Sequence, residues 1–547
     1  MTLKKLLIIG LLLVGLYARF ANLDQKVYTV DEVRGLLRAS GYAAEEPVDN
    51  LYTGELITNG QLQQYQTPTI EHSVGDALKA FANNPEHPPL YYLLMRFSLQ
   101  IFHTPVASRW LAVILSLLLL PATYWLAQLL FAPATVGTGA VDPKTVGWSA
   151  IALIAVSPFH VLLAQEARQY SLWALLLVVS SAFLLQALKH NHWKQWLAYG
   201  ATAVLGIYSH LFFAWVLISH GLYVLVIEKF RPTQKLLRYI VISIGIIVAF
   251  LPWAWVIVSR HSQLEKTTKW ASNYQTGILD RAEYWVHNLG IGFIDFDWPV
   301  SFINPLSYLV LAGFLYSLYQ LCRYTPKRVW LFLVLLMGIS AFAQVVPDIL
   351  NSGRRSLLPR YSLTVYLGIE LVVAYAMALA IGPMASQLQS SQKVSQPQLA
   401  GLKVRQASIL ALLLGGVVSS LLIAQSLDWG KGSSTISLIA SPQINQAEQP
   451  IVISDTEYFY LLSLSYYVNP DTRYLLLNSE QPESYNAILA QLPPGSEFFV
   501  YSPSAVLAEA IQSNKALESD IVLPEAQSPE TQANPKRGLY TVRRLPS

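Results

Sequence analysis

The sequence predicts a mainly α-helical protein that crosses a membrane many times and carries a small α/β domain at its C-terminal end. Of the 547 residues, 53% are hydrophobic and only 13% are charged, a charged fraction about half that of an average soluble domain. Apolar runs of about 17–25 residues, the length that a helix needs to cross the hydrocarbon core, recur along most of the chain. Composition therefore excludes an ordinary soluble protein.

The first apolar run follows Lys4 and Lys5 and reads LLIIGLLLVGLYARF. A secretory signal peptide would end in a cleavage site of small residues, and none follows this run, whereas many more apolar runs do. We therefore expect an uncleaved first helix. The chain has a single cysteine, Cys322, so a disulfide within the chain is excluded.

We expect about eleven membrane-spanning helices. The segment around Glu166 to Arg168 is interpreted as a break between two spans, because one helix over 147–188 would overshoot the bilayer. The runs, in order, predict spans near residues 4–21, 106–131, 147–165, 169–188, 194–210, 211–227, 238–257, 303–321, 329–346, 362–381 and 407–425.

Charge in the loops predicts the orientation, with a cytoplasmic N-terminus and an extracytoplasmic C-terminal domain. Basic side chains gather in alternate loops, which is the bias that cytoplasmic loops show. The only acids in these loops are Asp142 and Glu228. The basic residues are Lys144, Lys189, Lys194, Lys229, Arg231, Lys235, Arg238, Arg323, Lys327, Arg328, Lys393, Lys403 and Arg405.

The opposite side carries the long segments, namely the first outer loop 22–105, then 258–302, 347–361 and everything after about 426. Within the first of them, PPLYYLLMRFSLQIF is apolar and aromatic but too short to cross comfortably. We expect it to lie as an interfacial helix, with side chains suited to the headgroup region: Tyr91, Tyr92 and Arg96.

Composition changes after the last span, which divides the chain into a membrane domain, 1–425, and a C-terminal domain, 426–547. PIVISD, RYLLLN, EFFVYS and GLYTVRRL have the character of short strands. TEYFYLLSLSYYV, YNAILAQL and AVLAEAIQS, between them, have that of helices. SPETQANPKRG is expected to be a polar loop and SQLQSSQKVSQPQLAG a flexible linker.

The adjacent carboxylates Asp31 and Glu32 have two interpretations. In TVDEVR they stand at a helix start, where acids favour the helix dipole and cap the first turn. Alternatively, one carboxylate acts as a general base that removes a proton from an attacking hydroxyl. Both interpretations stay open at this point, because the pair lies on the predicted outer side directly after the first span.

Three further polar groups stand close to predicted helix ends. His87 in NNPEHPPLYY either rigidifies the helix entry with its prolines or binds an anion. Glu166 and Arg168, beside Tyr170 in AQEARQYSL, either neutralise each other or form a functional site, since ionisable groups at membrane depth are costly. His210 in YSHLFF is expected to pack among aromatic rings, with anion or sugar contact as the alternative.

Arginines gather in NSGRRSLLPRYSL, on the side where positive charge is otherwise scarce. Arg354, Arg355 and Arg360 lie just before a predicted span. The planar guanidinium matches phosphate oxygens, so a specific phosphate site is favoured over general attraction to anionic lipid headgroups. A carboxylate base on one side and arginines on the other would suit a reaction in which a lipid phosphate leaves.

These motifs, taken in order, resemble a known family. A short N-terminal span, Asp31 and Glu32 shortly after it, and a long outer loop ending in PEHPPLYY resemble the integral-membrane glycosyltransferases of the C superfamily (GT-C). The likeness is greatest to the branch of protein O-mannosyltransferases and bacterial aminoarabinose (lipid A) transferases, and it covers residues 1–425. It implies a polyprenyl-phosphate sugar donor, an outward active site, inversion at the anomeric carbon, and a multi-pass location in a bacterial-type cytoplasmic (inner) membrane.

The resemblance also implies roles for particular residues. The family's first-loop aspartate, its candidate base, falls on Asp31, with Glu32 as the neighbour that holds or polarises the acceptor. NPEHPP stands where aminoarabinose transferases have a Glu-Lys-Pro motif whose lysine lies near the lipid phosphate, and His87 takes the lysine's place.

Two further matches concern phosphate binding. Family members often carry an Asp-Pro pair after the third span, where this chain has Arg168, Gln169, Tyr170 and Ser171, which makes Arg168 a candidate phosphate contact and leaves the aspartate's role unfilled. Arg360 matches an Arg-Tyr element that precedes a late span in bacterial members.

The sequence thus predicts a hexosyl or pentosyl transferase that uses a polyprenyl-phosphate donor and an acceptor that is a lipid, a glycan or a protein, within membrane lipid. No phosphate-loop glycine pattern appears, and no nucleic-acid partner is expected. No cofactor is expected, although the acidic pair could ligate a divalent metal. The alternatives are a lipid-linked sugar transporter, which should hold its polar groups near mid-membrane, and a membrane-anchored scaffold.

Overall fold

The computed structural model describes residues 3–132, 141–272, 274–382, 396–492, 497–523 and 538–544. The chain divides into two compact units, each formed from segments that are distant in sequence. Unit 1 consists of Met1–Leu23, Phe81–Tyr91 and Arg109–Gln425. Unit 2 consists of Asp24–Ala80, Tyr92–Ser108 and Ser426–Ser547, so it groups most of the first outer loop with the C-terminal segment.

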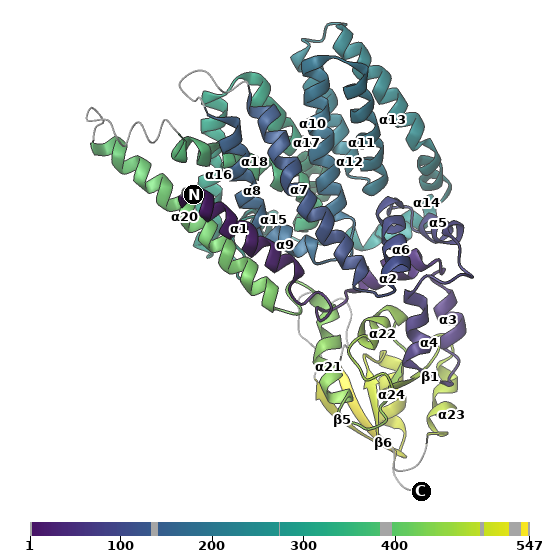
Figure 1. Ribbon diagram of the computed structural model, residues 1–547. Coiled ribbons are helices and arrows are strands. Elements are labelled where there is room, and N and C mark those ends of the chain that lie inside the picture. The colour runs from purple at the N-terminus through teal and green to yellow at the C-terminus, as the bar shows by residue number, and fades with distance from the viewer. Residues whose placement is uncertain are drawn as a thin grey trace. The chain divides into compact units, whose positions relative to one another are not determined.

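Unit 1 is helical throughout its described residues (Figure 1). Three short 3-10 turns, η3 (Lys269–Ala271), η4 (Arg355–Leu357) and η5 (Pro359–Ser362), interrupt its connections. Its helices are α1 (Leu3–Phe20), α7 (Ala107–Phe131), α8 (Pro143–Ala155), α9 (Pro158–Ala164), α10 (Tyr170–His190), α11 (Trp193–Ser209), α12 (Phe213–Ile227), α13 (Gln234–Ser259), α14 (His261–Thr268), α15 (Ile278–Ile291), α16 (Pro305–Tyr324), α17 (Lys327–Leu350), α18 (Leu363–Ile381) and α20 (Gln396–Gln425).

Each of the predicted spans coincides with one of these helices, and the predicted polytopic helical fold is confirmed. Among the residues that the structure describes, seven helices are long and apolar enough to cross a membrane, or eight if the bent pair α8 and α9 counts as one span. The expected number of about eleven also counts α1, α11 and α12, which have only 18, 17 and 15 residues, less than the roughly 20 that a helix needs to span the hydrocarbon core. The protein is a multi-pass membrane protein.

The predicted continuous span over 147–165 is wrong in one respect, because the chain bends by 62° between α8 and α9. Pro158 opens α9, where its missing N–H costs nothing. The break frees backbone carbonyls, and buried side chains satisfy them: the Arg19 guanidinium donates to Ile154 and Ala155, and the Ser420 hydroxyl donates to Val156. A broken helix is stable at this depth only because protein groups replace the lost hydrogen bonds.

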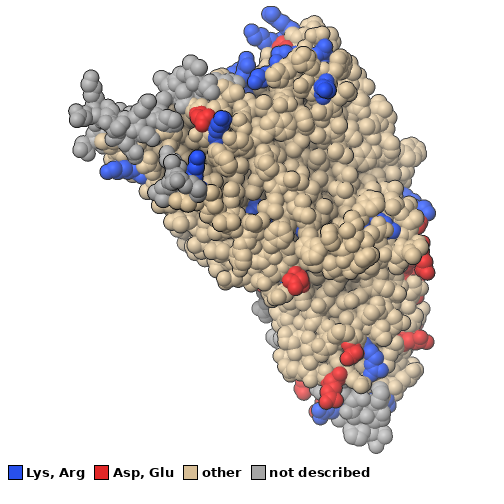
Figure 2. Space-filling view, in the orientation of Figure 1, with Lys and Arg blue, Asp and Glu red and all other residues tan. Residues whose placement is uncertain are grey.

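The core of unit 1 lies around α10 and α18, whose apolar windows are 72% and 78% buried, whereas that of α13 is only 17% buried. On the face drawn in Figure 2, Lys and Arg side chains gather at the end of unit 1 where α10 joins α11 and α12 joins α13. Away from that end, the surface of unit 1 on this face is mostly uncharged. Basic residues occupy these connections in the sequence, including Lys189, Lys194, Lys229 and Arg231.

Unit 2 is built on a six-stranded sheet in the order β1-β3-β2-β4-β6-β5. The central strand β2 is parallel to β3 and β4, while the remaining pairs are antiparallel. The strands are β1 (Leu56–Thr58), β2 (Ile451–Ser454), β3 (Arg473–Leu476), β4 (Glu497–Tyr501), β5 (Leu517–Leu523) and β6 (Leu539–Arg544). The helices are α2 (Val30–Ser40), α3 (Glu46–Leu51), α4 (Asn59–Gln63), most of α5 (Val74–Ala82) and α6 (Leu90–Phe102), α21 (Ile436–Ile444), α22 (Tyr458–Ser465), α23 (Tyr485–Leu489) and α24 (Ala505–Ser513), with 3-10 turns η1 (Gln64–Gln66), η6 (Gly432–Thr435) and η7 (Pro482–Ser484).

The predicted α/β character of the C-terminal segment is confirmed, because all four predicted strands and all three predicted helices form. Two strands were missed. β1 comes from the first outer loop and pairs with β3, which no local pattern indicates, and β5 lies in a segment without clear alternation. The predicted polar loop SPETQANPKRG falls almost entirely outside the described residues, and so does most of the predicted linker, whose last residues begin α20.

The predicted interfacial helix exists as α6, but the prediction for its polar side chains is wrong. Tyr91, Tyr92 and Arg96 are almost completely buried in protein. In unit 2 the Arg96 guanidinium donates to the backbone carbonyls of Ala39 and His72. The two Nη groups of the guanidinium thus bond to backbone carbonyls inside the protein, and the side chain is only 2% exposed. The exposed residues of α6 are Phe97, Gln100, Ile101 and Phe102, so its exposed side is mostly apolar.

Candidate functional site

The candidate site in unit 1 is centred on His210, in the connection between α11 and α12. Its imidazole stacks on the Trp173 indole at a centroid distance of 4.3 Å and an interplanar angle of 10°. The backbone N–H of Phe212 donates to His210 Nδ1 at 3.1 Å. Because Nδ1 accepts a hydrogen bond, the ring is the neutral tautomer that carries its proton on Nε2.

Arg168 and Arg360 place positive charge beside this ring. Burial, together with the charges of these two guanidinium groups, lowers the pKa of His210 from its ordinary 6.5 to about 3. The imidazole therefore stays neutral at physiological pH. Two arginines from connections far apart in sequence thus act on one neighbourhood, the arrangement that a bound phosphate needs. Sequence analysis proposed all three residues. The rings of Tyr170 and Tyr361 lie 6.0 Å and 6.3 Å from the His210 ring, which places the turns that carry the two arginines beside it.

The connection from α9 to α10 holds Arg168 firmly. Arg168 is only 4% exposed, and its backbone N–H donates to the carbonyl of Glu166 at 2.7 Å. Gln165 Nε2 donates to the Ala18 carbonyl at 2.5 Å. Tyr170 is buried directly after this turn, with its ring centroid 6.0 Å from that of His210. Glu166 is half-buried.

Arg360 lies in η5, the turn that leads into α18. Its guanidinium carbon is 5.5 Å from the ring centroid of Tyr361. The Tyr361 ring lies 5.3 Å from that of Phe212, and Gln344 Nε2 donates to the Tyr361 carbonyl at 3.0 Å. The ring of Tyr361 therefore joins the aromatic wall around His210, and α17 holds its backbone.

The other two arginines of the same segment lie apart from this wall in their described contacts. The Arg354 guanidinium carbon is 5.1 Å from the ring of Trp270 and 5.5 Å from the ring of Tyr274, a cation–π arrangement. Arg355 is half-buried at the start of η4. The predicted three-arginine group is therefore divided between two neighbourhoods of unit 1.

Buried polar groups fix the loop that carries these arginines. The Asp348 carboxylate accepts from the backbone N–H of Ser356 at 2.5 Å, and Arg281 Nη1 donates to the Gly353 carbonyl at 2.5 Å. A Cβ at Gly353 would lie 2.1 Å from Asp348 Oδ1, a distance that excludes a side chain there. The loop is thus rigidly built, which is what a phosphate-binding loop requires.

His87 lies in the segment that precedes α6, and this segment contacts α13. Trp253 Nε1 on α13 donates to the carbonyl of Pro85 at 3.2 Å, and the backbone N–H of His87 donates to Asn84 at 3.0 Å. The imidazole is half-buried. The rigid proline-rich entry that the sequence predicts is present, while the described contacts do not join His87 to His210.

In unit 2, Asp31 and Glu32 open α2. Thr29 is the N-cap residue, and its hydroxyl accepts from the Glu32 backbone N–H at 3.2 Å while the Glu32 carboxylate accepts from the Thr29 backbone N–H at 3.0 Å. This is a complete capping box. Glu32 is 0% exposed, so its carboxylate stabilises the helix start, as the capping interpretation predicts. Asp31 is half-buried in the same turn.

Sequence analysis missed a buried ionisable pair in unit 1. His160 Nε2 on α9 lies 2.9 Å from Glu370 Oε2 on α18, and the two side chains are 2% and 1% exposed. Glu370 is the only acid in the predicted span 362–381. Ionisable groups at membrane depth usually have a function. A single acid within an apolar span was therefore the sequence feature that could have revealed this pair.

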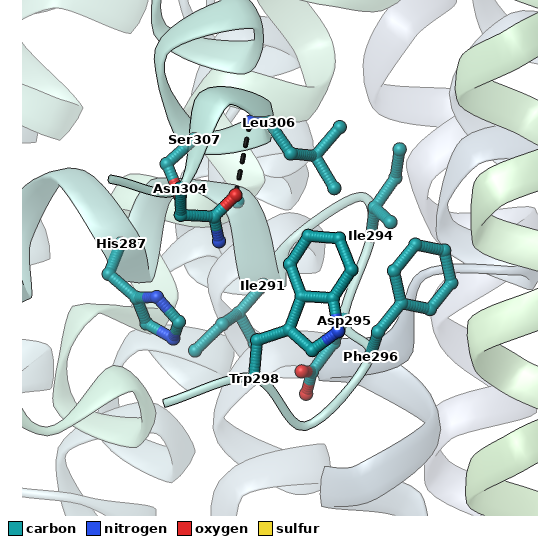
Figure 3. A pocket seen from close by; sticks show the side chains of 10 residues that line it. His287, Ile291, Ile294, Asp295, Phe296, Trp298, Asn304, Leu306 and Ser307 are labelled. Atoms are coloured by element: carbon teal, nitrogen blue, oxygen red, sulfur yellow. Dashed lines mark hydrogen bonds between the residues drawn. The ribbon is translucent and has the colours of Figure 1, made fainter. Parts of the chain in front are cut away.

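Figure 3 shows a small pocket in unit 1 lined by His287, Asp295, Trp298 and Asn304. Asn304 Oδ1 accepts from the Leu306 backbone N–H at 3.0 Å and so caps α16. The cavity volume is about 20 Å³, enough for roughly one water. Its polar and aromatic lining is typical of a sugar site, but a sugar ring does not fit in this conformation.

Metal binding has no separate support from geometry. Within the described ranges, no group of three or more His, Cys, Asp or Glu residues lies close enough to hold a metal ion. The described cluster of cations around His210 would itself repel a metal ion.

Comparison with known proteins supports the fold. No protein-family model and no curated protein matches the sequence. The structure of ArnT from Cupriavidus metallidurans bound to undecaprenyl phosphate matches with a TM-score of 0.53 at 15% identity, over 98% of this chain and 97% of that chain. The same protein in the apo state matches with a TM-score of 0.51 at 14% identity, over the same shares of the two chains.

A weaker likeness joins the chain to the oligosaccharyltransferase of Archaeoglobus fulgidus in complex with Zn and sulfate. Its TM-score is 0.44 at 11% identity, over 90% of this chain and 68% of that chain, and this is too distant to support an argument. The ArnT structures, in contrast, cover both the helical unit and the C-terminal segment. The chain therefore has the fold of ArnT, and the predicted resemblance is confirmed for the fold alone.

Proposed function

We propose that this protein transfers a hexosyl or pentosyl group from a polyprenyl-phosphate donor to an acceptor on the extracytoplasmic side of the membrane. The acceptor hydroxyl or amine attacks the anomeric carbon as the bond from that carbon to the phosphate oxygen breaks. Asp31 takes the proton of the acceptor, and polyprenyl phosphate leaves with the electron pair. One displacement at the anomeric carbon inverts its configuration.

The observation that carries the proposal is that the two turns bearing arginines lie beside His210. The ring of Tyr170, two residues after Arg168, lies 6.0 Å from the His210 ring, and the ring of Tyr361, next to Arg360, lies 6.3 Å from it. A departing phosphate develops negative charge, and fixed guanidinium groups stabilise that charge without reorganising. The fold adds weight, because the ArnT structure with the same fold was solved with bound undecaprenyl phosphate.

The other candidate residues take supporting roles in this proposal. Tyr170 and His87 offer hydrogen bonds to phosphate oxygens or to the sugar, and Glu166 sets the turn that presents Arg168. Arg354 and Arg355 guide the anionic lipid headgroup toward the site, because charges on one rigid loop raise the local concentration of an anion. Glu32 positions α2, and with it Asp31, through the capping box.

The proposal also includes location and orientation. The basic loops that gather at one end of unit 1 would lie in the cytoplasm, with the N-terminus on the same side and the C-terminal domain outside. A bacterial-type cytoplasmic membrane supplies polyprenyl-phosphate sugars to such an enzyme. The acceptor is a lipid, a glycan or a protein.

A lipid-linked sugar transporter is the second candidate, and one observation favours it. The broken helix pair α8 and α9 and the buried pair His160 and Glu370 are features that transporters use at their midplane sites. In such a protein the arginines would bind phosphate during movement, and no sugar would change its covalent partner.

The test uses the purified full-length protein, radiolabelled polyprenyl-phosphate sugars and a panel of acceptors. We expect wild type to transfer label, Asp31→Asn to lose turnover by at least about 100-fold, as loss of a general base does, and donor binding to persist. Asp49→Asn, which changes an exposed acid in the first turn of α3, is the matched control and keeps full activity. Unchanged turnover in Asp31→Asn would remove the base, and lipid movement without transfer would favour the transporter.

A further inference from the structure

The pair His160 and Glu370 joins the two segments of unit 1 that carry the phosphate-binding arginines. His160 lies on α9, 8 residues before Arg168 (168 − 160), and Glu370 lies on α18, 10 residues after Arg360 (370 − 360). Because α18 begins at Leu363, about 10 Å of helix lies between the end that leads to Arg360 and Glu370. The 2.9 Å contact therefore fixes α9 against α18 at a point within the two helices, away from the helix ends that lead to the arginines.

The pair is buried among described side chains: Glu370 Oε2 contacts His160, while the other carboxylate oxygen, Oε1, has no hydrogen-bond partner among the described residues. Glu370 also feels the positive charge of Arg19, which is fully buried and bonded to the carbonyls freed by the break between α8 and α9. Both members of the pair are at least 98% buried. In a low-dielectric interior, a shift of α9 along α18 would leave a charged or polar group uncompensated, at a cost of several kcal/mol.

An apolar contact would not give the same precision. Leu or Ile side chains tolerate sliding with little change in energy, whereas a charge-assisted hydrogen bond has one favoured geometry. Buried polar groups are best attested as devices that set register between packed helices. Here the register sets the separation of Arg168 and Arg360.

We propose that His160 and Glu370 are positioning residues, which hold α9 and α18 in the register that places Arg168 and Arg360 on one lipid phosphate. The proposal rests on the proposed function, since it assigns phosphate binding to the two arginines. The pair itself does not touch the substrate. Its loss therefore weakens binding of the donor phosphate more than it slows the chemical step.

The experiment measures the affinity of the purified full-length protein for undecaprenyl phosphate without sugar, and KM and kcat for the donor. We expect Glu370→Leu to weaken lipid binding and raise KM by about ten-fold, a change within the coupling range of contacting residues, with kcat changed far less. Glu370→Gln, which keeps a hydrogen-bond acceptor for His160, should recover most of the affinity. An unchanged affinity in Glu370→Leu would overturn the proposal.

The control is His220→Gln, in another buried histidine of unit 1. His220 is 1% exposed and bonds to the Ser181 hydroxyl at 3.1 Å and the Tyr199 hydroxyl at 3.3 Å, but its helix carries neither arginine. We expect this variant to lower thermal stability and leave lipid affinity unchanged. An equal loss of affinity in His220→Gln would show a general packing effect and would contradict a positioning role.

A double-mutant cycle covers the case in which Glu370→Leu does not fold. Glu370→Met and His160→Met each remove the same contact, so the double variant should bind undecaprenyl phosphate no worse than the weaker single variant. Additive losses would overturn the proposal. Because lipid binding is measured without turnover, this result stays separate from the proposed function, whose failure would appear as absent sugar transfer in wild type.

Discussion

Arg168 of unit 1 and Asp31 of unit 2 are the two residues on which the proposed chemistry depends most, and the chain holds them in different ways. Asp31 belongs to a local motif, a helix start closed by the capping box of Thr29 and Glu32. Arg168 belongs to a tertiary arrangement, in which connections from three parts of unit 1 meet around His210. The difference teaches that a base can be presented by one helix turn, whereas a phosphate site needs several segments in register.

The largest effect is expected from the tertiary arrangement. Arg168→Gln and Arg360→Gln should each reduce kcat/KM for the donor by about 100-fold, because each removes a fixed charge that stabilises the leaving phosphate. Steady-state kinetics with a labelled donor checks this. Lys at either position should restore part of the activity, since it returns the charge without the planar fork.

The control for these variants is Arg238→Gln, an arginine of unit 1 in a predicted cytoplasmic segment, where its side chain stacks on Trp193. We expect kinetics like those of wild type. If Arg168→Gln and Arg238→Gln behaved alike, the phosphate site would lie elsewhere.

His210 is expected to produce the next largest effect, on stability at acid pH. Its folded pKa of about 3 lies below the ordinary 6.5, so between these values the unfolded chain binds more protons, and the free energy of unfolding falls as the pH falls. At pH 5 the difference is about 2 kcal/mol, and above pH 7 it vanishes. His210→Asn, which keeps an acceptor for the Phe212 N–H, should remove this part of the acid sensitivity in thermal unfolding scans.

The comparison for His210→Asn is the same variant at pH 7.5, where no titration difference remains. An acid sensitivity identical to that of wild type would mean that the imidazole is accessible to protons in the folded protein. The two arginines would then not be adjacent to it.

The local motif of unit 2 is expected to give a smaller effect. Glu32→Ala breaks the capping box and should lower the free energy of unfolding by about 1–2 kcal/mol. Turnover per folded molecule should fall only modestly, because the Glu32 side chain is completely buried and is not exposed to the acceptor substrate. Asp31→Asn should show the reverse, with stability close to wild type and turnover lost. Thermal unfolding and turnover measured on the same preparations check both variants.

The smallest effect is expected from Arg354. Its guanidinium lies over the rings of Trp270 and Tyr274, so we expect Arg354→Gln to raise KM for the donor by only about three-fold, the loss of a weak electrostatic attraction. The effect should shrink further at high salt. A loss as large as that of Arg360→Gln would place Arg354 in the phosphate site itself.

Sequence patterns predicted the parts of the fold that depend on local periodicity. Long apolar runs located the membrane helices, and alternation located four of the strands around the Ile451–Ser454 centre of the sheet. The first turn of α2 was also within reach, since Thr29 and Glu32 have the spacing of a capping box.

The rest depended on contacts between distant segments. β1 pairs with β3 across more than 400 residues of sequence, and the break after α8 is stable because Arg19 and Ser420 satisfy the freed carbonyls. The burial of Arg96 follows from two acceptors in other segments. Periodicity carries no information on such partners, so these features could not be predicted from one sequence.

The candidate site shows the same division. Arg168, His210 and Arg360 were each selected for their residue type at a helix end, but their convergence, and the wall of Trp173 and Tyr361 around them, needed the tertiary structure. Asp31 and Glu32 were selected together as an acidic pair. In the structure Glu32 is completely buried, whereas Asp31 is half-buried. Local sequence identifies candidate side chains, and packing decides which of them act together.

The most direct test of the central claim is photo-crosslinking with an undecaprenyl phosphate analogue that carries its reactive group beside the phosphate. We predict that peptides containing residues 165–173 and 358–362 are labelled together, and that excess undecaprenyl phosphate suppresses the label. Labelling that spares both peptides and falls on the lipid-facing surface of α13 would contradict a phosphate site between Arg168 and Arg360.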